Sequence, residues 1–456
     1  MTTTDLCPRP PSIFRTHLAA TIGIFSLAFM FAFEAIAVLT VMPVVAADLD
    51  GLSWFGVAFA APMATGVVAL TVSGWWCDRS GPAAPMLTGV ALFVAGLVVA
   101  GLAGSMPVFL VGRAVQGLGS GLAGVALYVV IGRAFPESIR AAAMAVLTSA
   151  WTLPAVVGPP LAGLLAHAVG WRWVFLAVPV LAVVAVATLM PTLRRSGGGG
   201  AATARPEVVA AVVIAVGVLG LAVAGQRGFP GWWLGVVVAV ATVLAVGPRL
   251  LPPGTWRGAP GVPSAIATRG LVSAGYFGVE AYFPLSLVEH RGLGTTASGA
   301  ALMGAAFGWF LGAWASANLS LFADRRRRTL VGVAAVTAGC LAVLGTLVPW
   351  VPIAVLVVGW AVGGFGMGMA GTTLSVYVLD SSEPSEQGAN CASLQVNDQM
   401  VTATALAVGS VIFAVVMSVD ETAAYLSVML AGTGLVLAAF WSRARIESRE
   451  WERGHV

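Results

Sequence analysis

The sequence predicts an all-α polytopic membrane protein with fourteen spans, arranged as two six-helix bundles plus two extra transmembrane helices. Composition is the first reason: 59% of the 456 residues are hydrophobic and 9% are charged, against about 25% charged residues in soluble domains. The second reason is that apolar runs of roughly 20 residues, enough to cross a bilayer, recur along the chain. The third is the distribution of arginines described below.

The apolar runs fall into groups of six, two and six. The first six lie at about 18–44, 54–76, 84–104, 107–132, 141–168 and 172–191. A glycine-rich linker at 194–207 precedes two shorter runs at about 208–225 and 232–248. Six more follow at about 264–288, 295–322, 329–348, 351–379, 389–418 and 422–441. We therefore expect an N-terminal bundle at 1–193, a linker with two helices at 194–263 and a C-terminal bundle at 264–456.

Arginine placement orients the chain. All 23 basic residues are arginines, and nineteen of them, Arg269 included, share one side of the membrane if the N-terminus is cytoplasmic. Only Arg172, Arg227 and Arg291 fall on the other side, and Arg113 falls within a span. This asymmetry follows the positive-inside rule, so we expect both termini in the cytoplasm and the protein in a bacterial inner membrane. Because these arginines flank membrane spans, they do not indicate nucleic-acid binding. We expect the protein to be a monomer in the lipid bilayer.

One span carries an arginine among glycines, in the stretch LVGRAVQGLGSGLAG at 110–124. A guanidinium at this depth costs roughly 2.5–3.5 kcal/mol on insertion scales, so Arg113 should face protein or water and have a partner. Helical spacing puts Arg113, Gln116 and Ser120 on one face. Small residues that would let another helix approach closely stand at Gly117, Gly121 and Gly124. The alternative is a buried arginine that only locks two helices together.

Glu34 is the candidate partner of Arg113. With about 1.5 Å of rise per residue, Glu34 should lie about 15 Å, and Arg113 about 10 Å, below the outer ends of their spans, within reach of an arginine side chain. Burial and a nearby cation act oppositely on a carboxyl group, so such a pair can take up and release a proton. We expect Glu34 and Arg113 to couple transport to protons; the alternative is a permanent salt bridge.

Two further acids lie inside apolar runs. Glu280 stands among Tyr276, Phe277 and Tyr282, an arrangement that suits a lipophilic cation, although the aromatics could also simply face lipid. Asp398 is a reserve candidate for proton coupling, in a polar stripe that should line a cavity or form a helix-packing ladder. The stripe consists of Gln395, Asp398, Gln399 and Thr402. We expect Glu280, its aromatics, Gln116, Gln395 and Gln399 to contact substrate.

The remaining acids are expected in solvated loops, among them Asp48, Asp380 and Asp420. No nucleophile–base set, metal-ligand cluster or phosphate loop is visible in the sequence, and the four cysteines show no metal or disulfide spacing. We therefore expect no enzyme activity, no metal and no cofactor.

Five segments resemble the major facilitator superfamily, and within it the drug:proton antiporters with fourteen spans. They are EAIAVLTVMP (34–43), GWWCDRSG (74–81), GRAVQGLGSG (112–121), VVGPPLAG (156–163) and GWRWVFLAVP (170–179). The resemblance implies conformational signature residues at Gly74, Asp78, Arg79, Gly81, Gly158, Pro159 and Gly163. This sequence departs from the family pattern at two places. The basic residues expected after Gly81 are missing, and so is a glycine expected upstream of Gly158 in the span-5 signature.

The signature residues also have physical interpretations. A helix N-terminus could receive the Asp78 carboxylate, and that contact would act as a latch for one conformation. Pro159 lacks a backbone N–H donor and Gly158 lacks a side chain. This segment should therefore kink or stiffen its helix. Together these features predict a proton-driven exporter of small lipophilic molecules that works by alternating access. The alternatives are a dedicated metabolite, siderophore or lipid exporter of the same fold, and a membrane sensor or enzyme without transport.

Overall fold

The computed structural model describes residues 17–51, 55–195, 207–224, 232–293, 295–319, 324–417 and 419–446. These residues form helices and turns, with no strand among them. The first group of helices is α2 (Leu18–Asp48), α3 (Phe55–Ser80), α4 (Ala83–Gly101), α5 (Met106–Ala134), α6 (Glu137–Val169), α7 (Arg172–Leu176) and α8 (Pro179–Arg195). Most of the expected linker, residues 196–206, lies outside the described residues.

A pair of helices and two short turns separate the first group from the second. They are α9 (Val208–Ala224), α10 (Trp232–Val246), η2 (Gly247–Leu250) and η3 (Thr255–Arg257). The second group is α11 (Val262–Glu280), α12 (Phe283–Arg291), α13 (Thr295–Asn318), α14 (Arg325–Leu344), η5 (Gly345–Leu347), α15 (Ile353–Asp380), α16 (Gln387–Met417) and α17 (Glu421–Arg443).

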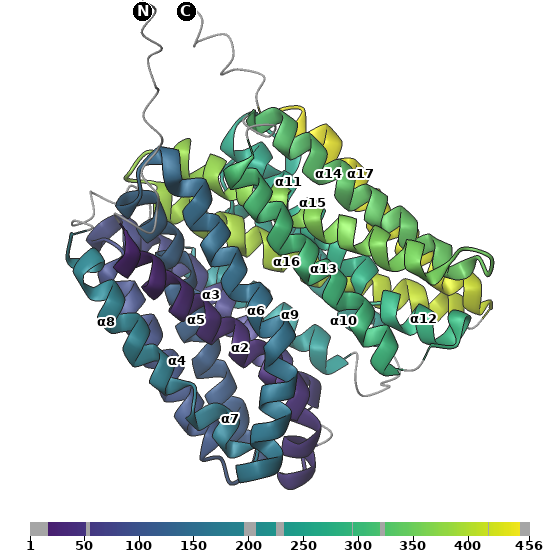
Figure 1. Cartoon of the computed structure of the whole chain (residues 1–456), viewed down its shortest axis with the longest axis horizontal. Coiled ribbons are helices and arrows are strands. Elements are labelled where there is room, and N and C mark those ends of the chain that lie inside the picture. The colour runs from purple at the N-terminus through teal and green to yellow at the C-terminus, as the bar shows by residue number, and fades with distance from the viewer. Residues whose placement is uncertain are drawn as a thin grey trace, which may run out of the picture.

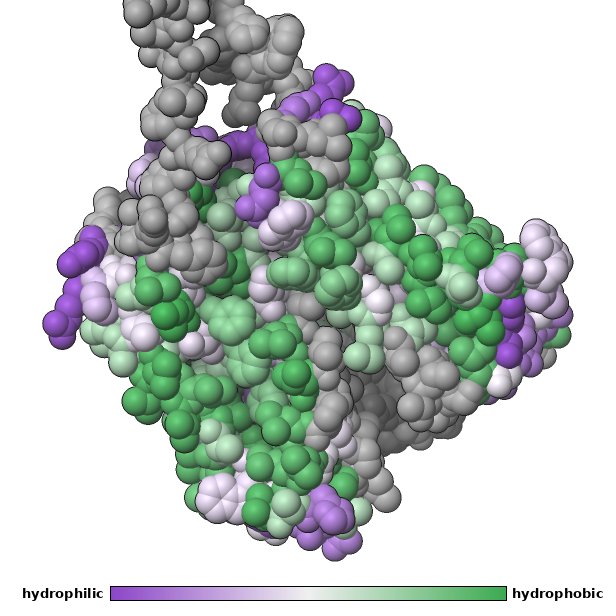
Figure 2. Space-filling view, viewed as in Figure 1, coloured by the Kyte–Doolittle hydropathy of each residue, from purple (hydrophilic) through white to green (hydrophobic). Residues whose placement is uncertain are grey.

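Nine spans within the described residues are long and apolar enough to cross a membrane. Hydrophobic residues cover most of the coloured face in Figure 2, and hydrophilic residues gather at its margins. The all-helical membrane class is thus confirmed, whereas fourteen crossings stay a prediction. The run expected at 264–288 is interrupted at Ala281–Tyr282, where α11 ends and α12 begins.

Local sequence explains where several helices begin and end. The Asp324 carboxylate caps α14 by accepting the backbone N–H of Arg326 at 3.0 Å, and Asp420 caps α17 in the same manner. Gly81 follows α3 with a φ of +82° and Gly292 follows α12 with a φ of +64°. Glycine adopts such angles without the steric penalty of a Cβ, so these turns require it.

Glycines also set how closely the helices pack. A Cβ on Gly117 of α5 would lie 2.3 Å from the Pro62 carbonyl oxygen of α3, and Gly121 continues the same contact. In the second group, a Cβ on Gly368 of α15 would lie 1.9 Å from the Trp309 carbonyl oxygen of α13. Because lipid is as apolar as the side chains, membrane helices associate through such close contacts of small residues. The expected small-residue surface of α5 is therefore used against α3.

The two groups of helices lie side by side in Figure 1. They converge toward the end where α2 begins and α17 ends, and diverge toward the opposite end. The inserted pair connects them, because α9 packs on α3 while α10 packs on α9 and α16. Contacts between α3 and α16 and between α6 and α13 join the groups directly.

Candidate functional site

A buried ion pair occupies the interior of the first group. The Arg113 guanidinium of α5 pairs with the Glu34 carboxylate of α2, and these residues are 4% and 6% exposed. Arg113 also donates through Nη1 to Gln116 Oε1 at 2.6 Å and through Nε to the Ala58 carbonyl oxygen at 3.1 Å. The guanidinium thus links α5 to α2 and α3, and the expected contact between Glu34 and Arg113 is present.

Gln116 belongs to this ion pair rather than to an open surface. The residue is 1% exposed and lies against Gly96 of α4, and its Nε2 atom lacks a hydrogen-bond partner within the described structure. We had expected Gln116 to contact substrate, but its burial in this conformation leaves it a neighbour of Arg113. A buried donor left unpaired costs about 1–3 kcal/mol, so this site carries unused hydrogen-bonding capacity.

A second ion pair, Arg269–Asp398, lies where the two groups of helices meet. Arg269 Nη2 of α11 lies 3.3 Å from Asp398 Oδ2 of α16. Arg269 Nη1 donates to the Gly371 carbonyl oxygen at 3.0 Å and to Ser375 Oγ at 2.6 Å, both on α15. The Tyr128 side chain of α5 also interacts with this guanidinium, so the cluster spans both groups.

Arg269 was missed as a functional residue because it was counted with the cytoplasmic arginines. It lies instead within α11, with its side chain 14% exposed. One signal could have found it: Arg269, Ser273, Tyr276 and Glu280 recur at helical spacing, on one face of α11. Asp398, which the sequence singled out, gains its cation from this residue.

The polar stripe of α16 faces the first group of helices. Gln395 Oε1 lies 3.4 Å from the position of a Cβ on Gly124 of α5, and Gln399 Oε1 lies 3.9 Å from that of Gly66 on α3. The stripe also holds buried polar atoms without hydrogen-bond partners in the described structure, namely Gln395 Nε2, Asp398 Oδ1 and Gln399 Oε1. Such atoms offer free hydrogen-bonding capacity at the contact between the groups.

The aromatic residues around Glu280 divide between two environments. Tyr276 is 1% exposed and stacks on Trp360 of α15, with ring centres 4.4 Å apart. Its expected contact with substrate is therefore not available in this conformation, because the ring fills the core of the second group. Phe277 is half-buried against Tyr276, and Tyr282 packs against Phe413 and lines a cavity. Glu280 itself is half-buried at the end of α11.

Asp78 joins the two groups at the end of α3. Its two carboxylate oxygens accept the backbone N–H groups of Gly388 at 2.7 Å and Ala389 at 2.8 Å, in the first turn of α16. Asp78 is 3% exposed. A Cβ on Gly74 would lie 2.7 Å from the Gly388 carbonyl oxygen, so Gly74 allows the close approach. We call this contact the Asp78 latch; its position at a helix N-terminus matches the expectation.

The other signature residues have separate surroundings. Arg79 is exposed and lies beside Trp75, with its guanidinium carbon 5.6 Å from the ring centre. A Cβ on Gly158 would lie 3.2 Å from Ile36, so α6 packs closely on α2 there, whereas Gly163 has open space beside it. The α6 helix continues through these positions, and the side chain of Pro159 lies outside the described residues.

Further ion pairs tie the groups together near the latch. Asp380 of α15 pairs with Arg140 of α6 and with Arg325 of α14, and Arg325 also lies 3.4 Å from Glu137 of α6. The Asp380 side chain is 6% exposed. The expectation of a solvated loop acid was wrong here because two arginines from different helices converge on it.

Asp48 closes a contact within the first group at the opposite end. The Trp171 indole and the Arg172 guanidinium both donate to Asp48 Oδ2 at 3.0 Å. These hydrogen bonds, Trp171 first, lower the pKa of the Asp48 carboxyl below its usual range. Asp48 is therefore paired rather than simply solvated, although its side chain remains 47% exposed.

The described residues hold no group of three or more His, Cys, Asp or Glu side chains that could bind a metal ion. The candidates for a functional role are the Glu34–Arg113 and Arg269–Asp398 pairs, the polar stripe and the Asp78 latch.

Comparison with known proteins identifies the family. Residues 24–397 match the Major Facilitator Superfamily. A Mycobacterium tuberculosis protein named "Probable multidrug-efflux transporter" is 25% identical over 394 residues, which cover 80% of this chain and 81% of that protein. The Bacillus subtilis multidrug transporter protein MdtP is 29% identical over 168 residues, covering 36% and 31%.

Solved structures of low sequence identity share the fold. A human organic anion transporter superposes with a TM-score of 0.65 at 14% identity, covering 93% of this chain and 99% of that one. A proton:xylose symporter superposes with a TM-score of 0.64 at 14% identity, covering 93% and 95%. With the match over most of its length, the chain belongs to the Major Facilitator Superfamily of transporters.

Proposed function

We propose that the protein exports small lipophilic molecules in exchange for protons by alternating access. The buried Glu34–Arg113 pair is the observation that carries this proposal. A carboxylate inside a membrane bundle either pairs with a cation or binds a proton, because an unpaired charge there is too costly. Any movement that changes its distance from Arg113 therefore changes its affinity for a proton, which is the coupling that antiport requires.

The Arg269–Asp398 pair supports coupling from the other side of the molecule. Tyr128 belongs to α5, whereas Arg269 and Asp398 belong to the second group. Separation of the groups at this end would break the contact with Tyr128 while leaving the ion pair within its own group. We propose that this cluster reports the conformation, because its contact with Tyr128 is made only while the groups are together at this end.

Alternating access is supported by where the contacts between the groups gather. The Asp78 latch and the Asp380 ion pairs lie at the end where the groups converge. If the termini are cytoplasmic, the molecule is closed on the cytoplasmic side. Release of these contacts and closure at the opposite end would then expose the polar stripe to the cytoplasm.

The substrate class rests on the lining of the interface and on the relatives. Gln395 and Gln399 offer hydrogen bonds, while Glu280 offers a carboxyl group one helical turn from the half-buried ring of Phe277, and aromatic rings suit cations. The names of the M. tuberculosis and B. subtilis relatives refer to multidrug transport. Amphipathic compounds with an apolar body and a cationic group are therefore the proposed cargo.

Reconstituted vesicles test this function. With an imposed proton gradient, full-length protein should drive uptake of a lipophilic cationic dye against its concentration gradient, and a protonophore should abolish that uptake. Exchange of one proton for one monovalent cation moves no net charge, so the pH gradient alone drives it; each pH unit supplies roughly 1.36 kcal/mol, enough for about tenfold accumulation. Dye binding without proton-dependent flux would overturn the proposal. Flux of an endogenous lipid or metabolite alone would favour a dedicated exporter.

A further inference from the structure

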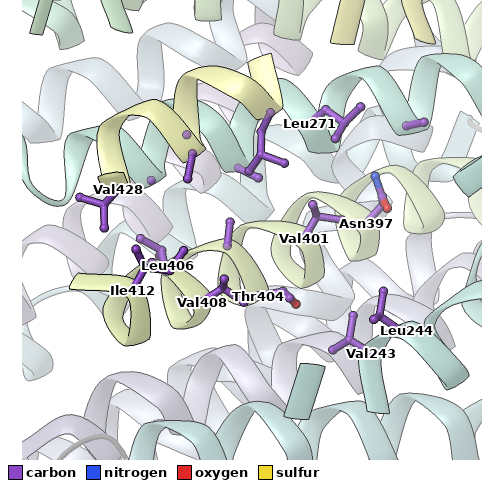
Figure 3. Close-up of a pocket in the computed structure, with 18 of the residues that line it drawn as sticks. Val243, Leu244, Leu271, Asn397, Val401, Thr404, Leu406, Val408, Ile412 and Val428 are labelled. Carbon is purple, nitrogen blue, oxygen red and sulfur yellow. The ribbon is translucent and has the colours of Figure 1, made fainter. Parts of the chain in front are cut away.

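An apolar cavity of about 460 Å³ lies between α10, α11, α16 and α17 (Figure 3). This volume falls in the range of roughly 300–1,000 Å³ typical of ligand pockets. Its lining residues extend along α16 from Asn397 to Ile412, which is about 22 Å at 1.5 Å per residue. The cavity is therefore long relative to a hydrocarbon core of about 30 Å, and a chain-like ligand fits it better than a compact one.

The cavity lies on a different face of α11 from the transport candidates. It is lined at helical spacing by Ala267, Leu271, Ala274 and Gly278. Arg269 follows Ala267 by two residues, and Glu280 follows Gly278 by two residues. Two residues correspond to a rotation of about 200° around the helix axis, so both charged side chains point away from the cavity face. The lining contains no residue of the two ion pairs or of the polar stripe, although it does include Tyr282, which was expected to contact substrate.

The lining has few polar groups, and two of them are already hydrogen-bonded. Asn397 Nδ2 donates to the Ile266 carbonyl oxygen at 2.8 Å, and Thr404 Oγ1 donates to the Met400 carbonyl oxygen at 2.7 Å. Leu244, at the edge of the cavity, is 58% exposed. The cavity therefore opens on the apolar outer surface, where bilayer lipid is the neighbour.

Arginines and tryptophans gather at one end of this cavity. Trp256 lines it, and the next residue, Arg257, is exposed on η3. Arg445 Nη1 donates to the Arg257 carbonyl oxygen at 3.1 Å, and the Arg445 guanidinium lies 4.0 Å from the ring centre of Trp441. Arg249 is exposed on η2. Tryptophan beside arginine is typical of the lipid headgroup region.

Among the described residues, the charge at this end has one sign. The segments 247–261 and 436–446 contain four arginines and no acidic residue. Basic pockets between transmembrane helices on the cytoplasmic side bind anionic lipid headgroups. A cationic transport substrate, by contrast, would be repelled here.

We propose that this cavity binds an anionic phospholipid, with an acyl chain along α10 and α16 and its phosphate at Arg249, Arg257 and Arg445. The lipid fixes the inserted helix α10 and its connection η2–η3 to the second group of helices. This gives the inserted pair a role that is independent of the transported substrate.

Binding of defined lipids to the purified full chain in detergent tests the proposal. Native mass spectrometry would compare dioleoyl phosphatidylglycerol, dioleoyl phosphatidylcholine and glycerol phosphate. We expect phosphatidylglycerol to bind and both other probes to bind at least tenfold more weakly, because the site needs both the chain and the negative charge. Arg257→Gln with Arg445→Gln should weaken phosphatidylglycerol binding roughly 30-fold. Arg327→Gln, at the exposed start of α14, is the matched control and should change nothing.

A cavity-filling variant separates this site from ordinary surface lipid. Gly409 lines the cavity and has room for a Cβ, so Gly409→Phe should block binding, whereas Gly220→Phe on the open surface of α9 should not. Equal binding of phosphatidylglycerol and phosphatidylcholine would overturn the proposal, as would phosphatidylglycerol binding that survives both the arginine and cavity variants. Displacement of the lipid by a transported dye would assign the cavity to substrate instead.

Discussion

Replacement of Asp78 by asparagine should open the end of the molecule where the two groups of helices converge. The carboxylate accepts two backbone N–H groups from Gly388 and Ala389 in the first turn of α16. A hydrogen bond to a charged group contributes about 1.5–3 kcal/mol, and a negative charge at a helix N-terminus contributes about 0.3–1 kcal/mol. Asparagine keeps one acceptor oxygen but turns a donor toward the second N–H.

The expected shift of the conformational equilibrium follows from these contributions. Asp78→Asn loses one charged hydrogen bond and the charge–dipole interaction, together about 2–4 kcal/mol. At 1.4 kcal/mol per factor of ten, this is about a 30- to 700-fold shift toward the open state at that end. Transport should fall because the closed state is rarely populated, whereas substrate binding should persist, since Asp78 contacts no ligand site.

Distances between spin labels would measure this shift. Ser138 and Glu383 are exposed, lie near the latch and belong to different groups of helices, so labels there report opening. Asp78→Asn should add a longer distance that dominates the distribution. Asp48→Asn, which removes a contact within the first group at the opposite end, should leave the distribution unchanged. An unchanged distribution in Asp78→Asn together with lost substrate binding would refute the latch.

Three further predictions concern the ion pairs and the topology. Arg113→Lys should lower proton-driven transport at least tenfold in vesicles, because lysine lacks the planar guanidinium that reaches Glu34, Gln116 and Ala58 together; wild-type rates would contradict this role. Tyr128→Phe should open the same end as Asp78→Asn, because it removes the hydroxyl that interacts with Arg269 across the two groups, measured with the same labels; Thr188→Val on α8, whose hydroxyl bonds within its own helix, is the control. Single cysteines at Gly198 and Gly228, which lie outside the described residues, should label from opposite sides of the membrane in a cysteine-free background, and labelling of both from outside would exclude the fourteen-span topology.

The first ion pair could be predicted because its two charges stand out in the sequence. Glu34 and Arg113 are isolated in apolar runs, and the cost of burying either one alone requires a partner at similar depth. The latch acid was predictable on another ground, since GWWCDRSG resembles a signature of the superfamily and a helix N-terminus is a favourable partner for its carboxylate. The residues that bind Asp78 could not be predicted, because Gly388 is 310 residues away in sequence and only the folded structure brings α16 to α3.

The second ion pair shows where sequence reasoning fails. Arg269 lies close to the start of its apolar run. At that position the sequence pattern is the same whether the arginine lies within the membrane or at its surface. Asp380 looked solvated because nothing in the sequence shows that Arg140 and Arg325 converge on it. Tyr276 looked available to substrate, but stacking on Trp360 places it in the core. In each case a long-range contact decides the environment.

Proton release on substrate binding tests the central claim most directly. Purified wild-type protein in weakly buffered detergent solution should release protons when a lipophilic cation is added, as measured with a pH-sensitive dye. Glu34→Gln should bind the same cation without releasing protons, and Asp398→Asn and Glu280→Gln are the comparison variants. The account predicts that only Glu34→Gln abolishes the release entirely. Normal release from Glu34→Gln, with release lost in Asp398→Asn or Glu280→Gln, would contradict it and move the coupling site to the second group of helices.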